Sequence, residues 1–246
     1  MWSDSAACVQ QYFYIFLAEW RCPTTKASIG MSALTLQVSL GQQDDLFTSG
    51  VSSLGLDACF RTAMRVTLDE YSWVEVVPNW LSGAHVLLGQ MTVSVPWRQH
   101  ERRMFDKVLR EPRLTAQYHD VRDVPEPMLF EAARALSHHY GVTYDSLWLN
   151  LYRDGQDSTG WHRDQFSCRR PECTVPVLTL GAQRRFLIKP RTGGRSVVFK
   201  PASGDLVVMG GRSQQDWIHS VPKDPTIASP RMSINFQSSA QAQRNG

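Results

Sequence analysis

The sequence predicts an α+β protein whose second half forms a β-sandwich or jelly roll. The pattern changes at residue 146, after which short runs of alternating apolar residues follow one another, separated by turns rich in Gly, Asp and Pro. Before this point the strongest periodicity is helical, and it ends at Gly141. Helices followed by many evenly spaced strands are typical of this class. The expected strands cover residues 146–153, 175–180, 185–189, 196–200, 205–209, 215–220 and 231–237.

Three elements are expected before the central helix. Residues 72–77 are rich in Val and predict a short strand, which Pro78 ends. Ser82 is expected to cap a helix that runs to about Met91. Residues 97–110 are basic and amphipathic, and we expect either a helix or an extended lid there.

The clearest helix in the sequence begins at Pro127, after a predicted strand over residues 112–118. Pro at the first helical position and Gly just after the last one are typical helix boundaries. Four apolar residues recur at helical spacing and indicate a face that packs on a sheet. They are Met128, Ala132, Leu136 and Tyr140.

The N-terminal residues differ in character from the rest of the chain. The apolar run from Tyr12 to Ala18 is too short to span a bilayer and lacks the flanks of a secretion signal. We therefore expect residues 1–40 to be a poorly ordered or peripheral extension, formed by an extra helix or by sequence upstream of a start at Met31. Residues 31–70 are expected to be mostly loop, and no membrane association is expected.

Composition narrows the partners and the compartment. The net charge is +3, but the cations concentrate in residues 98–113 and 184–200, which could meet phosphates or form solvated surfaces. The five cysteines fit neither a disulfide framework nor a zinc pattern, so we expect a reducing, cytoplasmic compartment. Cys168 and Cys173 are interpreted as two free thiols in a loop, with a second metal site as the alternative.

Three side chains are candidates for one metal site. His162 and Asp164 lie two residues apart, and on a strand such residues point to the same face. His219, in the strand-like run 216–221, is the best third ligand. Two histidines and one carboxylate on one side of a metal match the facial arrangement of non-haem iron oxygenases. The alternative is an exposed polar pair and a hydrogen-bonded histidine.

The order of several motifs resembles the AlkB branch of the Fe(II)- and 2-oxoglutarate-dependent dioxygenases. The resemblance covers about residues 72–237 and rests on the order of the pieces more than on any one of them. The pieces are Asn150-Leu-Tyr152-Arg-Asp-Gly, His162-Arg-Asp164, Gly204-Asp-Leu, His219 and Arg231-Met-Ser-Ile-Asn-Phe.

This resemblance implies a double-stranded β-helix, with N-terminal helices packed on one sheet, that holds one Fe(II) through His162, Asp164 and His219. It also implies that Arg231 binds the distal carboxylate of the cosubstrate 2-oxoglutarate, because a guanidinium grips a carboxylate through two hydrogen bonds. O2 takes the last position on the metal. The other expected cosubstrate residues are Asn150, Tyr152, Ser233 and Gln237, of which Ser233 and Gln237 stand where the family often has Asn and Arg.

By the same resemblance, residues 41–238 form the dioxygenase domain, with a nucleotide-recognition lid at about 97–120, a jelly-roll core at about 146–237 and a tail at 239–246. Four residues are expected to contact substrate. Arg113 would hold phosphates, whereas Trp97, Tyr118 and Phe166 would stack on bases. Trp161, beside a metal ligand, is expected to pack behind the site.

The implied function is oxidative demethylation of alkylated bases in DNA or RNA, with release of formaldehyde, succinate and CO2. A methylated base must be flipped out of a duplex or be single-stranded to reach such a site. We expect a monomer with nucleic acid as its partner. The alternatives are the same chemistry on a protein or small molecule, and a jelly-roll binding module without turnover.

Overall fold

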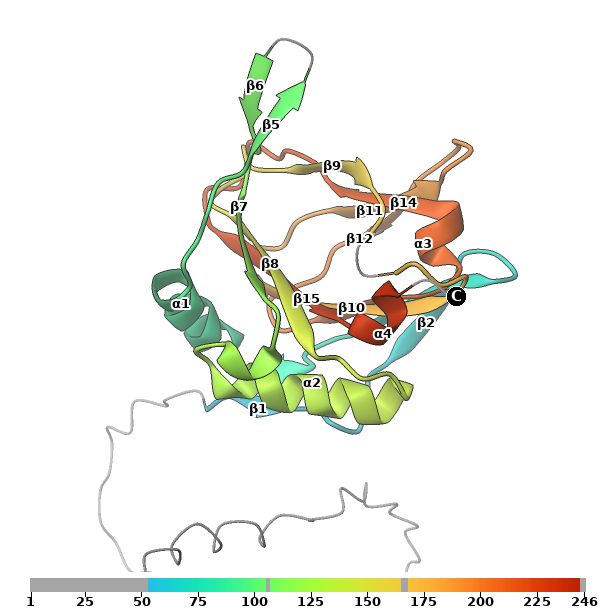
Figure 1. The fold of residues 1–246 in the computed structure, drawn as a ribbon, viewed down its shortest axis with the longest axis horizontal. Coiled ribbons are helices and arrows are strands. Elements are labelled where there is room, and N and C mark those ends of the chain that lie inside the picture. Colours follow the sequence, from blue (N-terminus) through green and yellow to red (C-terminus); the bar gives the residue numbers. More distant parts are fainter. Residues whose placement is uncertain (1–52, 105–106, 165–167, 244–246) are drawn as a thin grey trace, which may run out of the picture. The chain divides into compact units, whose positions relative to one another are not determined.

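The computed structural model describes residues 53–104, 107–164 and 168–243, and the extension expected at 1–40 lies outside them. Two antiparallel sheets face each other (Figure 1). The larger has the strand order β2-β3-β13-β10-β15-β8-β7 and the smaller has the order β12-β11-β14-β9. This arrangement confirms the predicted jelly-roll core.

The strands of the larger sheet are β2 (Met64–Thr67), β3 (Ser72–Val77), β7 (Leu114–Tyr118), β8 (Ser146–Tyr152), β10 (Cys173–Gly181), β13 (Leu206–Gly211) and β15 (Arg231–Gln237). Those of the smaller sheet are β9 (Thr159–His162), β11 (Phe186–Pro190), β12 (Val197–Phe199) and β14 (Trp217–Val221). A short pair, β1 (Gly55–Leu56) and β4 (Leu81–Ser82), lies apart from both, as does a hairpin of β5 (Glu101–Met104) and β6 (Lys107–Arg110).

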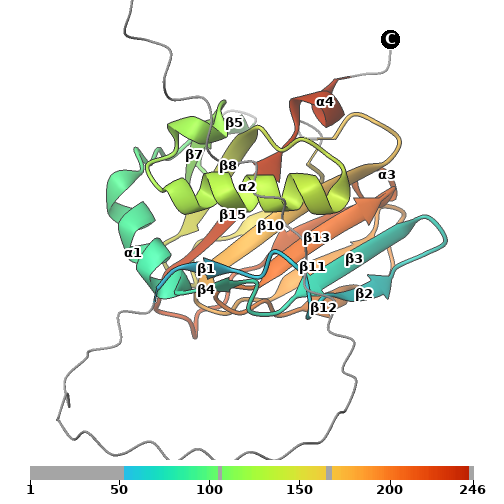
Figure 2. The same cartoon turned by 90° about the horizontal axis from the view of Figure 1, so that it is seen from below.

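The central strands of the larger sheet are buried on both faces. The outer face of this sheet packs against α1 (Ala84–Ser94) and α2 (Pro127–Tyr140), and Figure 2 shows α2 lying across its central strands. Its inner face packs against the smaller sheet in a second apolar cluster, which includes Val177, Ile188 and Met209. A strand covered on both faces reads as a nearly continuous apolar run, which explains why most residues of β10 and β13 are buried.

The two main helices begin differently from one another. α2 covers the predicted residues, with Pro127 in its first turn and Gly141 in the left-handed conformation after its last residue. The expected Ser82 cap of α1 is wrong, because Ser82 ends β4 and Gly83 occupies the N-cap position without a side-chain hydrogen bond. A Gly at this position adopts the positive φ of 69° without the steric cost of a Cβ atom.

Several short elements were not expected from the sequence. β1 and β2 lie in the stretch interpreted as loop, and the lid segment is a β-hairpin rather than a helix. β9 is a separate edge strand that ends at His162, so Asp164 lies just beyond it. Short helical turns complete the fold: η1 (Val121–Asp123), α3 (Ser213–Asp216) and α4 (Ser239–Ala242).

The interpretation of Cys168 and Cys173 as free thiols is wrong. The two residues form a disulfide, with their Cα atoms 5.9 Å apart, and both side chains are buried. The sequence did not reveal this pair because four residues lie between the cysteines, and only the turn between Cys168 and the start of β10 brings them together.

Among the described helices, none combines the length and the apolar character that crossing a membrane would need.

Candidate active site

Three side chains that could hold a metal ion converge between the two sheets. The ligand atoms of His162, Asp164 and His219 all lie within 4.8 Å of one another. Asp164 Oδ1 is 3.7 Å from His162 Nε2, and Asp164 Oδ2 is 3.6 Å from His219 Nε2. Nitrogen and oxygen ligands lie roughly 2 Å from a bound divalent metal, so atoms that share an ion can be up to about 4 Å apart. The separations of Asp164 from both histidines fit one shared ion.

Pairing between β9 and β14 places the two histidines side by side. His162 and His219 are direct partners in the ladder, with ring centroids 4.2 Å apart. His162 Nδ1 donates a hydrogen bond to the carbonyl oxygen of Gly160 at 2.8 Å, because a carbonyl can only accept. In the neutral ring this bond places the proton on Nδ1, so the lone pair is on Nε2, which lies 3.7 Å from Asp164 Oδ1, as a metal ligand requires.

His219 is almost fully buried, whereas the side chain of His162 is 40% exposed. Burial lowers the pKa of His219 to about 4, and the neighbouring Asp164 only partly opposes this effect. His219 is therefore neutral at pH 7 and has a lone pair available for a metal.

Asp164 is held through its backbone rather than through a strand. Its amide donates to Gln214 Oε1 at 2.8 Å, and its carbonyl accepts from the amide of Cys168 at 3.0 Å. The buried carboxylate oxygen Oδ2 has no hydrogen-bond partner among the described residues. A buried, unsatisfied carboxylate is costly unless it is paired or coordinates a cation, so this oxygen fits a metal ligand.

A second set of polar side chains lines the inner face of the larger sheet. Apolar residues of β8 and β15 point to the helices, and the alternate residues point into the space between the sheets. Ser233 pairs with Asn150 and Arg231 pairs with Tyr152 across the two strands. This alternation follows from the period of two along a strand.

Arg231 is only 2% exposed, yet much of its hydrogen-bonding capacity is unused. Nη2 donates to Thr179 Oγ1 at 3.3 Å, while Nε and Nη1 have no partner among the described residues. Burial lowers its pKa, with the nearby Tyr152 opposing this effect. A buried guanidinium with two unpaired donors indicates a site for a carboxylate.

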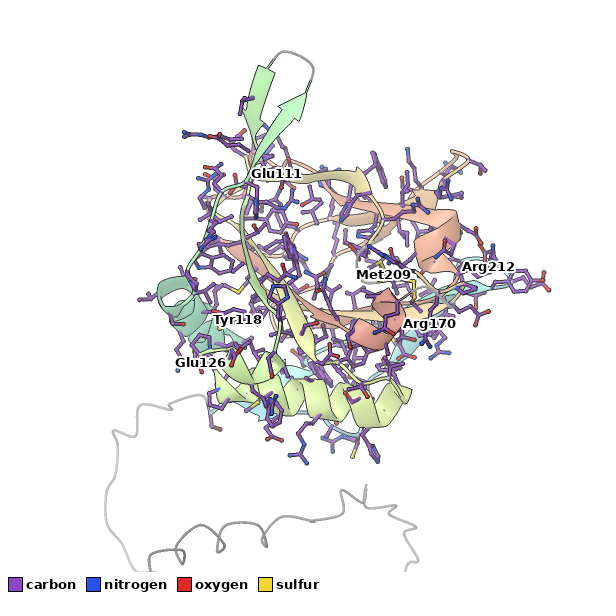
Figure 3. The ribbon with its side chains drawn as sticks, in the orientation of Figure 1. Glu111, Tyr118, Glu126, Arg170, Met209 and Arg212 are labelled. Atoms are coloured by element: carbon purple, nitrogen blue, oxygen red, sulfur yellow. A yellow bond between two sulfur atoms is a disulfide. The ribbon has the colours of Figure 1, made fainter. Side chains whose placement is uncertain are left out.

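Both sets of residues line one cavity of about 1140 Å³. Its lining includes the three candidate metal ligands, Arg231, and all four of the other expected cosubstrate residues. Glu111 lies at the base of the β5–β6 hairpin, and Met209 lies between the sheets (Figure 3). Both residues also line this cavity, so it extends from the inter-sheet core to the hairpin.

The family model of the 2OG-Fe(II) oxygenase superfamily matches residues 61–244. This chain belongs to that superfamily. Its oxygenases use Fe(II), 2-oxoglutarate and O2, and the orphaned oxygen of Asp164 and the unpaired donors of Arg231 fit the metal and the cosubstrate, respectively.

Curated relatives confirm the resemblance to the AlkB branch. Over 171 residues, this oxygenase is 30% identical to the alpha-ketoglutarate-dependent dioxygenase alkB homolog 3 of Homo sapiens. That match covers 61% of this chain and 60% of the relative. It is 26% identical over 196 residues to the DNA oxidative demethylase ALKBH2 of Homo sapiens, covering 74% of this chain and 73% of that protein.

Asn150 of the oxygenase is surrounded by three hydrogen-bonding neighbours. Its Oδ1 accepts from Arg113 Nε at 3.0 Å and from Trp148 Nε1 at 3.2 Å, and its Nδ2 donates to Ser233 Oγ at 3.2 Å. Arg113 also pairs with Glu111 at 3.0 Å. The structure thus brings Arg113 to the cosubstrate side of the cavity, whereas the sequence indicated only a phosphate contact. Arg113 directly precedes β7, and β7 pairs with β8, the strand that carries Asn150; this position in the sequence could have indicated the contact.

Trp97 and Tyr118 are not brought to the cavity. Both pack against the core beneath the helices, and Trp97 Nε1 donates to the carbonyl of Thr92 at 3.2 Å. Figure 3 shows Tyr118 near α2, at the far end of β7 from Glu111. The expectation that these two residues stack on a base is therefore not supported by their positions. Phe166 lies outside the described residues.

Trp161 also differs from its expectation. It is 41% exposed and does not pack behind the metal ligands. Trp161 alternates with His162 along the strand, so its exposed ring lines the cavity without packing behind the metal ligands. Arg184, which belongs to the basic stretch 184–200, is buried and donates to three backbone carbonyls, so it is a structural residue.

Proposed function

We propose that this protein is an Fe(II)- and 2-oxoglutarate-dependent dioxygenase that demethylates alkylated nucleic-acid bases. The observation that carries the proposal is one cavity that holds a His-Asp-His group and a buried arginine with unpaired donors. The names of the curated relatives support the choice of substrate. The match to alkB homolog 3 spans 60% of that protein, so we infer the activity and the substrate of this chain from its own site together with the names of its relatives.

In this function His162, Asp164 and His219 hold the iron, and Arg231 binds the distal carboxylate of 2-oxoglutarate. Asn150, with its oxygen held by Arg113 and Trp148, turns its amide nitrogen toward the cavity and binds the carboxylate nearer the metal. Tyr152, whose hydroxyl bonds to Thr159 Oγ1 at 2.8 Å, packs beside Arg231. Ser233 and Gln237 complete the polar face.

The iron supplies the redox chemistry that activates O2, which protein side chains cannot perform. One oxygen atom of O2 enters succinate as 2-oxoglutarate loses CO2, and the other converts an N-methyl group to N-hydroxymethyl. The hydroxymethyl group then leaves as formaldehyde, and the base nitrogen regains its proton or lone pair. The protein binds, orients and shields the reactants.

The substrate base must leave its stack to enter the cavity. Extruding a base costs a few kcal/mol, and less where methylation has already broken the pairing. A single-stranded or flipped nucleotide therefore fits this site better than a paired one. The cavity of about 1140 Å³ has room for the cosubstrate and a base together, since small-molecule sites occupy about 300–1,000 Å³.

The proposal is tested by incubating the iron-loaded protein with a panel of methylated DNA and RNA oligonucleotides and reading the products by mass. We expect loss of 14 mass units per methyl group, about the mass of one CH2, with one formaldehyde and one succinate per event. His219→Ala should abolish turnover, whereas the control His85→Ala, at an exposed position on α1, should retain it.

Two results would redirect the proposal. Succinate formation without demethylation of any oligonucleotide would assign the same chemistry to a protein or small molecule. No iron-dependent succinate formation with any substrate would favour a binding module. Full activity of His219→Ala would refute the assignment of the metal ligands.

A further inference from the structure

The edge of the smaller sheet beside the metal group carries an exposed aromatic ring among cations. We call this surface the β9–β11 rim and define it as Trp161, Arg163, Lys189 and Arg191. Trp161 flanks His162 on β9, Arg163 follows it, and Lys189 lies on β11 on the other side of β14. Arg191 follows the end of β11. Figure 1 shows these strands together in the sheet that faces the larger one.

The ring and the nearest cation are in contact across the sheet. Lys189 Nζ lies 4.3 Å from the centroid of the Trp161 ring. Lys189 pairs with Ile218 in the ladder, one residue before His219, so strand pairing fixes its distance from the metal group. An exposed indole supported by an ammonium group offers a flat, electron-rich surface for stacking.

Among the described residues, the cations of the rim are not neutralised by ion pairs. Arg191 Nη1 donates to the carbonyl of Gln215 at 2.8 Å, which fixes the guanidinium without cancelling its charge. The acidic residue of α3, Asp216, is already paired with Arg212 at 2.7 Å. Within the part of the chain that the structure describes, no carboxylate ion-pairs with Arg163, Lys189 or Arg191.

Arg163 is half-buried beside the metal ligands, whereas Arg191 is exposed. Cations that form no ion pair with a carboxylate leave a field that attracts an anion. This arrangement differs from ordinary surface arginines of this protein, such as Arg122 and Arg134, which each pair with a carboxylate.

The rim is continuous with the active-site cavity. Trp161 and Arg163 both line that cavity, together with His162 between them. An anionic polymer that inserts one unit at the metal group would therefore pass over Trp161 and Arg163 first. Lys189 and Arg191 then extend the positive surface away from the cavity mouth.

We propose that the β9–β11 rim binds the single strand that flanks the target base, with a neighbouring base stacked on Trp161 and phosphates on Arg163, Lys189 and Arg191. This inference rests on the proposed function and names the binding surface for its substrate. Proteins that bind single strands combine an aromatic stacking surface with a positive groove, and the rim offers both.

The two components of the rim predict different signatures in binding. Each phosphate contact contributes about −0.7 to the slope of log K against log salt for a single strand. Lys189→Gln or Arg191→Gln should therefore flatten this slope by about 0.7 each. Trp161→Ala should weaken binding roughly tenfold and leave the slope unchanged, because stacking releases no counterions.

The test uses the full chain with Fe(II) and 2-oxoglutarate under anaerobic conditions and a fluorescent 12-nucleotide single strand with one methylated base. Anisotropy titrations at several salt concentrations give affinity and slope for each variant. Arg134→Gln on α2 and Tyr71→Ala, an exposed ring 56% accessible on another surface, are the matched controls and should change neither quantity.

Rim variants that keep wild-type affinity and slope would overturn the inference. The inference would also be overturned if polyglutamate competed for the protein as well as an unlabelled oligonucleotide does and Trp161→Ala had no effect on binding. This pattern would indicate a general attraction of polyanions. Demethylation by the wild-type protein, measured in parallel, separates the two proposals. If the wild-type protein demethylates the strand but the rim variants bind normally, only the inference about the rim is refuted. If binding depends on the rim but no demethylation occurs, only the proposed reaction is refuted.

Discussion

Arg113 donates a hydrogen bond from Nε to Oδ1 of Asn150 at 3.0 Å, from the segment before β7 to the middle of β8. Because Trp148 donates to the same oxygen at 3.2 Å, the amide of Asn150 has one favoured orientation, with its nitrogen toward Ser233. Arg113 also pairs with Glu111 at 3.0 Å, so both residues are held beside Asn150 at the wall of the cavity. Through this hydrogen bond, Arg113 connects the lid segment to Asn150, which we propose binds the cosubstrate.

Arg113→Gln should therefore raise the 2-oxoglutarate KM by roughly tenfold, as expected for loss of one hydrogen bond from a charged donor. The melting temperature should change little, because the side chain lies at the edge of the cavity. Steady-state kinetics with varied 2-oxoglutarate measure the effect. Arg110→Gln, an exposed residue of the hairpin, is the control. An unchanged KM with weaker oligonucleotide binding would instead return Arg113 to a phosphate-binding role.

Two buried arginines, Arg231 and Arg184, should respond oppositely to the same substitution. Arg231→Gln should raise the 2-oxoglutarate requirement by roughly 100-fold with little loss of stability, since its two free donors await a ligand. Arg184→Gln removes hydrogen bonds to three carbonyls and should lower the melting temperature. Thermal melts and 2-oxoglutarate titrations of both variants test this contrast. An unaltered requirement in Arg231→Gln would place the cosubstrate elsewhere.

The metal-free protein should lose stability as the solution becomes acidic. The folded-state pKa of His219 is about 4, below its ordinary value of 6.5, so folding favours the neutral form. Above pH 6.5 the titration of His219 does not reduce the free energy of unfolding. As the pH falls from about 6.5 to about 4, the reduction grows toward roughly 3 kcal/mol. Urea unfolding with a chelator at several pH values measures the decline. His219→Gln should reduce it, and an equally steep decline in that variant would contradict the prediction.

The Cys168–Cys173 disulfide closes a short loop that leads into β10. Loop-closure entropy for about six residues corresponds to roughly 2 kcal/mol of stabilisation. Reduction, or the double substitution to serine, should therefore lower the free energy of unfolding by about this amount. Urea unfolding with and without reductant checks the value. A reductant effect of the same size in the serine variant would show that another group is responsible.

Much of the fold was accessible from sequence because local patterns match tertiary roles. The alternation along β8 and β15 separates residues that face the helices from those that face the cavity. It therefore indicated Asn150 and Arg231 as residues on an inner face. The helix α2 carries its own start and stop signals at Pro127 and Gly141.

Other features depended on contacts that no local pattern records. Asp164 reaches the metal group from outside a strand, held by Gln214, which lies 50 residues away. The segment that forms the hairpin β5–β6 is basic and amphipathic and has no strong turn signal. The sequence was therefore compatible with both a helix and an extended lid there. Trp97 and Tyr118 are aromatic residues in the lid region, but only packing shows that the core absorbs them.

By itself the sequence determined the order of strands, the residues able to bind a metal, and the arginine suited to a carboxylate, because periodicity and side-chain chemistry are local properties. The tertiary structure decided which of these residues meet. The β9–β14 pairing joins His162 to His219, burial leaves Arg231 with unpaired donors, and the cavity includes Arg113 while excluding Tyr118. These outcomes depend on contacts between distant segments, which pairing register and burial establish only when the chain has folded.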